Sequence, residues 1–128
     1  MKTIFLLFSH TLTEDQLQDA EKSLGTSRVV ALPEDLQKKF SNVPPDLITI
    51  AEYLQPIEQW LLNLAKEGDY ALIQGDFGAT HYLVNQCKNK GVIPVYATTE
   101  RQSIDQVQTD GSVVTQRIFK HKMFRKYE

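Results

Sequence analysis

The chain has 128 residues, enough for one compact domain with a hydrophobic core, and its formal net charge of −2 gives no overall attraction to nucleic acid or to a membrane surface. The single cysteine, Cys87, excludes an internal disulfide and is typical of a reducing compartment, and no apolar run is long enough to span a bilayer. We therefore expect one domain over residues 1–128, located in the cytoplasm, with no membrane partner.

The first predicted elements are a strand, a helix and a second strand. Residues Thr3–Phe8 form a short apolar run, which is typical of a strand covered on both faces in a parallel sheet. Thr13 and Gln16 have the spacing of a capping box, so a helix is expected to follow Thr13 and to end at Gly25. A second short strand is expected over residues 28–32.

The middle of the chain is predicted to hold a loop and then a long helix. Pro33 begins the loop, which contains Phe40. Asp46 is placed to cap a helix whose apolar residues recur at helical spacing as far as Ala65. Pro56 lies inside this helix and is expected to kink or split it.

Three further elements complete a regular alternation of strands and helices. A strand is predicted at residues 70–74, a helix at residues 78–90 and a fourth strand at residues 92–97. The order β-α-β-α-β-α-β predicts parallel strands joined by right-handed crossovers.

The tail has a different pattern. Asp110-Gly111 is the signal of a two-residue hairpin loop, and in that register Val107 would face Val114. The expected fold class is therefore α/β, with a mostly parallel sheet flanked by helices and a C-terminal β-hairpin.

Polar residues follow three of the predicted parallel strands at the points where these strands end. Because ligands of open α/β sheets bind beyond the carboxyl ends of the strands, we expect the three loops to form one site. They are Ser9-His10-Thr11 after the first strand, Gln74-Gly75-Asp76-Phe77-Gly78 after the third, and Thr98-Thr99-Glu100-Arg101 after the fourth.

The turn between Gly75 and Gly78 has two interpretations. Glycine lets the backbone approach a ligand, and the start of the helix offers unpaired N–H groups to phosphate; alternatively, the glycines serve only the bend. Asp76 is more often a helix cap than a ligand contact. If it faces a ligand, it repels phosphate and accepts a hydrogen bond from a ribose hydroxyl or an adenine amino group.

The other loop residues also have structural and functional interpretations. His10 is either a turn or capping residue or an imidazole that contacts a base or a phosphate. Thr98 and Thr99 either satisfy the loop backbone or contact the ligand. Arg101 is suited to hold a phosphate through two parallel hydrogen bonds.

The last twelve residues are basic. From Arg117 to Glu128 there are five Lys and Arg side chains and one acid. A charge run is usually a solvated face, but the interleaved aromatic residues Phe119, Phe124 and Tyr127 favour contact with nucleic acid.

No metal site or familiar nucleophile motif is visible. The three histidines, His10, His81 and His121, lack metal-binding spacing. No Walker lysine follows the glycine turn, and no Ser or Cys lies in a nucleophile elbow. We expect no cofactor.

Taken together, these residues resemble the short, stand-alone CARF-like proteins of type III CRISPR systems. The resemblance covers nearly the whole chain, although the family often has Asn at the position of Ser9. The matching segments are Lys2–Thr13, Gln74–Thr80, Ile93–Thr99, Phe119-Lys120-His121, Phe124-Arg125 and Tyr127.

This resemblance implies a Rossmann-like homodimer that binds a cyclic oligoadenylate at its two-fold axis, with no DNA partner. Some CARF proteins only sense the ring, whereas ring nucleases cut it and switch off the antiviral response. Because the chain has no room for a fused effector domain, the expected function is a ring nuclease, with cyclic tetra-adenylate as the substrate. The alternatives are a sponge that binds the ring without cutting it and, from another class, a nucleotide-binding regulatory or interaction module.

Ring cleavage of this kind needs no metal, because a ribose 2′-hydroxyl attacks its own neighbouring phosphate. The protein must align the reacting atoms, stabilise charge on phosphate and transfer protons. Imidazole suits the last task, since its ordinary pKa lies near neutrality. The catalytic candidates are His10, Arg101, Lys120 and His121, and the ligand-binding candidates are Ser9, Gln74, Gly75, Asp76, Phe77, Gly78, Thr98, Thr99 and Arg125.

Overall fold

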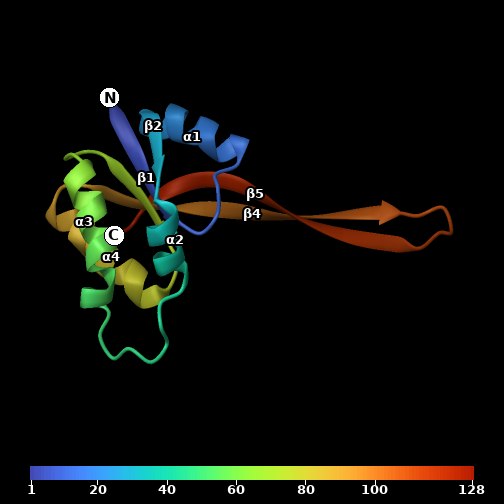
Figure 1. Cartoon of the computed structure of the whole chain (residues 1–128). Helices are drawn as coiled ribbons and strands as arrows, with labels where there is room; N and C mark the ends of the chain where they lie inside the picture. The colour runs from blue at the N-terminus through green and yellow to red at the C-terminus, as the bar shows by residue number, and fades with distance from the viewer.

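The computed structural model describes residues 1–128 as an α/β body from which a long β-hairpin projects (Figure 1). All five strands form one sheet in the order β2-β1-β3-β4-β5, parallel except for the antiparallel pair of β4 and β5. In chain order the elements are β1 (Lys2–Phe8), α1 (Glu14–Leu24), β2 (Thr26–Ala31), α2 (Glu34–Ser41), α3 (Ala51–Leu64), β3 (Tyr70–Gln74), α4 (Phe77–Asn89), β4 (Ile93–Val107) and β5 (Val113–Lys126).

Helices cover both faces of the sheet, with α1 on one face and α2, α3 and α4 on the other (Figure 1). The alternating side chains of β1 and β3 supply both cores. Leu7 and Ile73 belong to the larger core under α2, α3 and α4, while Leu6 and Leu72 belong to the smaller core under α1. Burial on both faces explains why these strands are continuous apolar runs.

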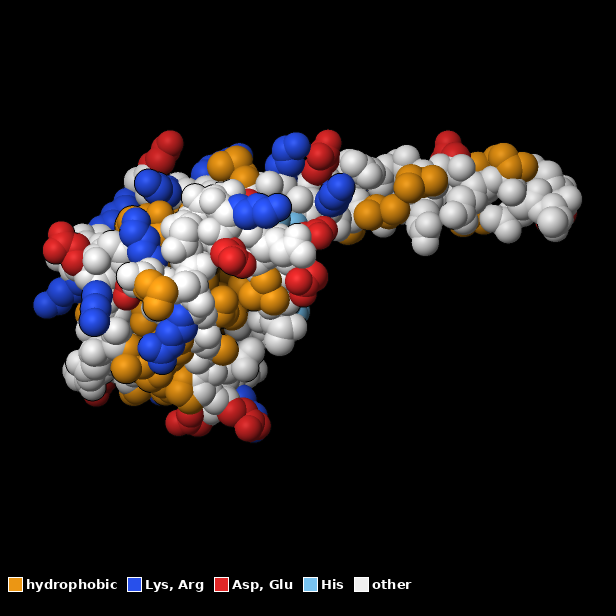
Figure 2. Space-filling model, turned by 90° about the horizontal axis from the view of Figure 1, so that it is seen from above, with side chains coloured by type: hydrophobic (Ala, Val, Ile, Leu, Met, Phe, Trp, Pro, Cys, Tyr) orange, Lys and Arg blue, Asp and Glu red, His pale blue; other side chains and the backbone are white.

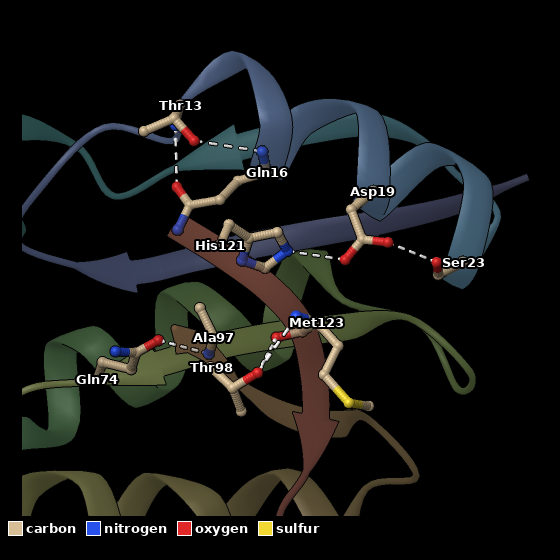
Figure 3. A network of polar contacts seen from close by, with 9 residues as sticks. All are labelled: Thr13, Gln16, Asp19, Ser23, Gln74, Ala97, Thr98, His121 and Met123. Atoms are coloured by element: carbon tan, nitrogen blue, oxygen red, sulfur yellow. Dashed lines mark hydrogen bonds and ion pairs between the residues drawn. The ribbon is translucent and has the colours of Figure 1, made fainter. Parts of the chain in front are cut away.

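The predicted beginning and end of the first helix are confirmed. Thr13 Oγ1 accepts a hydrogen bond from Gln16 N, and Gln16 Oε1 accepts one from Thr13 N (Figure 3). Gly25 ends α1 with a φ of 68°, a left-handed conformation that glycine adopts without strain. The predicted strand at residues 70–74 is also confirmed.

The prediction for the middle of the chain is wrong in two places. The expected loop after Pro33 contains the helix α2, whose Phe40 is buried beneath the sheet. The next helix does not begin after Asp46 but at Ala51: Ile50 takes the N-cap position, its O accepts the first helical hydrogen bond from Leu54 N, and its side chain lies close to Gly78 at the start of α4. Pro56 does not split this helix: α3 is continuous from Ala51 to Leu64, although Pro56 lies in its second turn and cannot donate a backbone hydrogen bond to Glu52.

The C-terminal hairpin is longer than predicted and has a different register. The fourth strand does not end at Ala97 but continues to Val107, which pairs with Val113 rather than with Val114. The connection therefore has five residues instead of two. Asp110 Oδ1 accepts hydrogen bonds from the backbone N and the Oγ of Ser112, and this local turn replaces the tighter one.

Candidate functional site

The winding of the sheet reverses between β1 and β3. From β1 the chain passes outward to β2 and then returns across β1 to β3. In open α/β sheets a ligand crevice lies at such a switch point, beyond the carboxyl ends of the two strands. Phe8 pairs with Gln74, so the residues that follow β1 and β3 start from neighbouring positions at one edge. The predicted convergence of these two loops is confirmed.

The third loop of the predicted site does not exist. Thr98, Thr99 and Arg101 lie within β4, and Arg101 pairs with Phe119 on the projecting hairpin. The polar side chains after Ala97 mark the point where the strand leaves the core rather than the point where it ends. We define the switch-point cluster by the residues at the neighbouring ends of β1 and β3: Ser9, His10, Gln74, Gly75, Asp76 and Phe77.

Hydrogen bonds fix the backbone of the turn after β3. Asp76 Oδ2 accepts from Ala79 N at 3.0 Å and caps α4, and Thr80 Oγ1 accepts from Gly75 N at 3.2 Å. These contacts leave the N–H groups of Phe77 and Gly78 directed outward at the helix start. The carboxylate of Asp76 lies beside them and repels phosphate, so the turn suits a ribose or a base better.

The two glycines of the turn have packing roles. A Cβ on residue 75 would lie 2.6 Å from Cε2 of Phe40, and a Cβ on residue 78 would lie 3.2 Å from Cδ1 of Ile50. Gly75 therefore gives room to a buried ring from α2. The sequence suggested two reasons for these glycines, close approach of the backbone to a ligand or formation of the bend. For Gly75 the structure adds a third reason, which is contact with the ring of Phe40.

Phe77 is the exposed aromatic residue of the cluster. Its side chain is 94% exposed at the first position of α4. An exposed ring at a strand–helix turn offers a stacking platform for a nucleobase. His10 lies at the end of the neighbouring strand, where its ring stands edge-on to that of Phe8 with centroids 5.4 Å apart.

A groove opens beside His10. It has a volume of about 250 Å³ and is mainly apolar. The helix α2 supplies Gln37 to this groove, where its Nε2 donates to Phe8 O at 3.4 Å. Outside the groove, Ser41 of the same helix has its Oγ 2.8 Å from Ser9 Oγ. The sequence prediction missed both residues because it missed α2. The lining residues are Leu6, Phe8, His10, Thr11, Leu12, Leu17, Val29, Ala31, Leu32 and Gln37.

Two of the ligand-binding candidates form hydrogen bonds with strand backbone, Gln74 with β4 and Thr98 with β5 (Figure 3). Gln74 Oε1 accepts from Ala97 N at 2.7 Å, where the ladder between β3 and β4 has ended. Thr98 Oγ1 both donates to Met123 O and accepts from Met123 N at 3.2 Å, beside the β-bulge that shifts the pairing of β5. Thr98 thus has the structural role that the sequence left open.

His121 lies away from the switch-point cluster. Its side chain is 5% exposed between β5 and α1, and its Nε2 is 2.8 Å from Asp19 Oδ2 (Figure 3). Asp19 also accepts a hydrogen bond from Ser23 Oγ at 2.6 Å. This chain of contacts attaches α1 to the base of the hairpin and gives His121 a structural role.

The contacts of Asp19 make folding stability depend on pH. Partial burial opposes ionisation, but the hydrogen bonds from Ser23 and His121 and the charge of His121 outweigh it and hold the pKa of Asp19 below its ordinary value. A lowered pKa in the folded state contributes stability above the unfolded value of about 4, and this contribution is lost as the pH falls through the folded value.

We therefore expect Asp19→Asn to lower the free energy of unfolding by about 1 kcal/mol at pH 7. The difference from wild type should shrink as the pH falls below about 4, where Asp19 becomes protonated. Urea unfolding between pH 7 and pH 3 measures this difference, with Glu21→Gln, an exposed change on the same helix, as the control. A difference that stays constant with pH would contradict the assignment.

The remaining cationic candidates are dispersed. Lys120 is exposed on the hairpin, and Lys122 pairs with Glu100 at 3.9 Å. Arg125 Nη1 donates to Tyr96 OH at 3.0 Å, beside a shallow hollow at the edge formed by β5. Neighbouring strands are ~4.8 Å apart, so β5 lies about 14 Å from β1. The basic tail is therefore spread over the hairpin and does not form one patch at the switch point.

Other parts of the structure offer no better site. A hollow of about 430 Å³ lies at the amino ends of β1 and β2, but its carboxylate, Asp69, accepts hydrogen bonds from the backbone N of Thr3 and Lys66 and so has a structural role. Cys87 is buried, and burial together with the charge of Glu58 raises the pKa of its thiol to about 12. No three His, Cys, Asp or Glu side chains come together as a metal site requires, and no helix is long and apolar enough to cross a membrane.

Residues 2–125 match the family described as the Uncharacterized protein MJ1673 family. The chain belongs to this family. It is similar to Uncharacterized protein MJ1673 of Methanocaldococcus jannaschii, with 50% identity over 127 residues that cover 99% of this chain and 98% of the relative. No solved structure matches the chain. The similarity therefore extends over nearly the full length of both chains.

Proposed function

We propose that this member of the MJ1673 family is a cytoplasmic ring nuclease that binds a cyclic oligoadenylate, cyclic tetra-adenylate in the first place, and cuts it. The observation that supports the proposal is the switch point: Ser9 and His10 follow β1, the exposed Phe77 follows β3, and the two strands pair up to their ends at Phe8 and Gln74. This edge offers an imidazole, a hydroxyl and a stacking ring to a nucleotide. Cutting the ring would end type III CRISPR antiviral signalling.

The strand order supports a Rossmann-like, CARF-like fold. The order 2-1-3-4-5 is the flavodoxin-like order, in which nucleotides bind beyond β1 and β3. The antiparallel β5 is an addition to this plan. A symmetric ring presents identical nucleotides on its two halves, so an isologous homodimer with one switch point in each copy can hold both.

The proposed reaction uses a nucleophile of the substrate. The 2′-oxygen attacks the adjacent phosphorus, the bond from phosphorus to the 5′-oxygen breaks, the hydroxyl proton passes to a base, and the 5′-oxygen gains a proton. The products are linear, with a 2′,3′-cyclic phosphate at one end and a 5′-hydroxyl at the other. Of the two histidine candidates, His10 is exposed at the strand end while His121 is buried against Asp19, so we assign proton transfer to His10.

Arg101 is assigned to a phosphate other than the one that His10 serves. It lies three residues beyond Thr98, about 10 Å along β4. In the sheet β3 lies between β4 and β1, so Arg101 and His10 belong to strands that are not neighbours, and we assign them to different phosphates of the ring. Its guanidinium lies over the ring of Phe119, with 5.4 Å from Cζ to the centroid, which leaves the N–H groups available to an anion.

We expect Arg101→Ala to weaken binding of cyclic tetra-adenylate by about 10- to 100-fold, as loss of a charged hydrogen bond does, and to change the turnover number little. The wild-type affinity should fall as salt rises, and the variant should show a smaller salt slope. Calorimetric titration at two or more salt concentrations measures both. The matched control is Arg117→Ala, one cross-strand pair further out on the same face; equal losses in the two variants would argue against a specific contact at Arg101.

Incubation of purified protein with cyclic tri-, tetra- and hexa-adenylate in EDTA, followed by chromatography and mass spectrometry, tests the proposed reaction. We expect loss of the tetramer and linear products that carry 2′,3′-cyclic phosphate. Tight binding with the ring recovered intact would replace the nuclease by a sponge. If no ring size is bound or cut, a nucleotide-binding regulatory module becomes the better interpretation.

A further inference from the structure

The distal hairpin is a long surface with no helix packed on it (Figure 1). We call residues 99–120, from β4 through the connecting loop to β5, the arm. An isolated two-stranded ribbon is marginally stable in water. The arm nevertheless exposes a series of large apolar side chains to solvent: Ile104, Val107, Val113, Val114, Ile118 and Phe119.

The pairing register assigns these side chains to two different faces. Directly paired residues of an antiparallel ribbon point to the same side, and successive residues point to opposite sides. One face carries Arg101, Asp105 and Arg117 among its apolar residues, and we call it the charged face. The opposite face begins next to the body with the charged pair Glu100–Lys120. Beyond this pair it consists of Gln102–Ile118, Ile104–Gln116 and Gln106–Val114, and we call these three pairs the neutral face.

The neutral face has a regular composition. Along β4 an isoleucine lies between two glutamines, and along β5 a glutamine lies between two β-branched apolar residues. The three apolar side chains, Ile104, Val114 and Ile118, are therefore diagonal neighbours on one stripe, each of them 38–50% exposed. Viewed from above, the outer half of the arm is mostly orange and white, while the blue and red side chains gather mainly nearer the body (Figure 2).

We propose that the neutral face packs against the neutral face of a second copy of this chain. The centres of homodimer interfaces are apolar and depleted of charge, and isologous contacts use the same patch on both copies. The three pairs of the neutral face carry no cation that would attract a nucleic acid or an acidic peptide, whereas an identical face matches their apolar and amide composition. Pairing through the outer edge of β5 is disfavoured, because Lys120, Lys122 and Lys126 lie along this strand and lysine on an edge opposes strand addition.

The size of the face predicts how strong the contact is. The five residues from Gln102 to Gln106 measure about 17 Å along a ribbon about 10 Å wide, so two such faces cover well under the ~1,200 Å² typical of a stable complex. The arms alone therefore give a dimer that dissociates on dilution. A ligand that both copies hold will shift this equilibrium toward the dimer. The neutral face would thus be a contact surface of the proposed homodimer. Only the expected effect of the ring on dimerisation rests on the proposed function.

Sedimentation velocity over a wide range of protein concentration tests the arm contact. Ile104→Asp places a charge on the neutral face, and its matched control, Ser103→Asp, places the same charge on the charged face one residue away. We expect Ile104→Asp to weaken self-association by roughly tenfold or more and Ser103→Asp to change it little. Ile104→Thr, which keeps β-branching and so favours an intact strand, should also weaken the dimer.

Wild-type protein that stays monomeric at every concentration, or Ile104 variants that associate as wild type does, would overturn the inference. Equal losses in the Ile104 and Ser103 variants would also overturn it, because the contact would then not select a face. Ring cleavage is scored separately. If the wild-type protein cuts the ring but Ile104→Asp leaves the dimer unaltered, only the arm contact is rejected. If Ile104→Asp dissolves the dimer but the wild-type protein cuts no ring, only the proposed function is rejected.

Discussion

Replacing His10 by alanine should slow cleavage of cyclic tetra-adenylate about 10²- to 10⁴-fold, the loss expected when a general acid or base is removed. The substrate keeps its own nucleophile, so slow cleavage should remain. Binding should change far less, because Phe77 and Ser9 still line the edge of the sheet. Single-turnover cleavage and equilibrium titration of the same variant separate the two effects.

His81→Ala is the matched control for this prediction. His81 is exposed on α4, where its Nε2 is 3.3 Å from Asn85 Nδ2, and it lies outside the switch-point cluster. We expect its removal to leave the cleavage rate unchanged. Full activity in His10→Ala would mean that the protein acts by positioning the reacting atoms alone. Stabilisation of the phosphate charge by the cations of the arm would then be the main contribution of the protein.

The second large effect concerns folding. Phe40→Ala should lower the free energy of unfolding by about 3–5 kcal/mol, because it leaves a cavity where a fully buried ring had been. Gly75→Ala should cost about 1–3 kcal/mol for the opposite reason, since the added methyl group meets that ring. Urea unfolding of each variant gives both numbers.

The double variant makes this prediction specific. Once Phe40 is alanine, the methyl group added at residue 75 has space, so Gly75→Ala should cost little in the Phe40→Ala background. The cycle should therefore show a favourable interaction energy of about 1–3 kcal/mol between the two changes. Additive losses would show that Gly75 is required for its backbone conformation and not for its contact with Phe40.

The parallel core could be predicted from the sequence because its strands are buried on both faces. A run such as Tyr70–Gln74 needs no distant information to be identified, and its ends were located correctly. The cap of α1 was equally local, since Thr13 and Gln16 are three residues apart. In contrast, α2 has a single fully buried residue, Phe40, and a preceding proline that favours a loop.

The C-terminal hairpin was predicted, but its length could not be, because the strands of the arm do not face a core. Beyond Ala97 the side chains of β4 are polar or mixed, a pattern that a loop shares, and only pairing with β5 identifies a strand. The same difficulty affected the site. The contact between Asp19 and His121 joins residues 102 positions apart, so the structural role of the histidine could not be read from its neighbours. The polar residues after β1 and β3 were predicted to lie at one edge of the sheet, but the strand order that makes these two ends neighbours came only from the structure.

The central claim is that a cyclic oligoadenylate binds at the switch point between β1 and β3. Titration of ¹⁵N-labelled protein with cyclic tetra-adenylate, followed by amide chemical shifts, tests it most directly. We predict that the largest shift changes fall on residues 9–12 and 74–80, saturate with the ring and grow weaker as salt is added. Changes confined to the hollow at the amino ends of the strands, or no changes at any ring concentration, would contradict the claim.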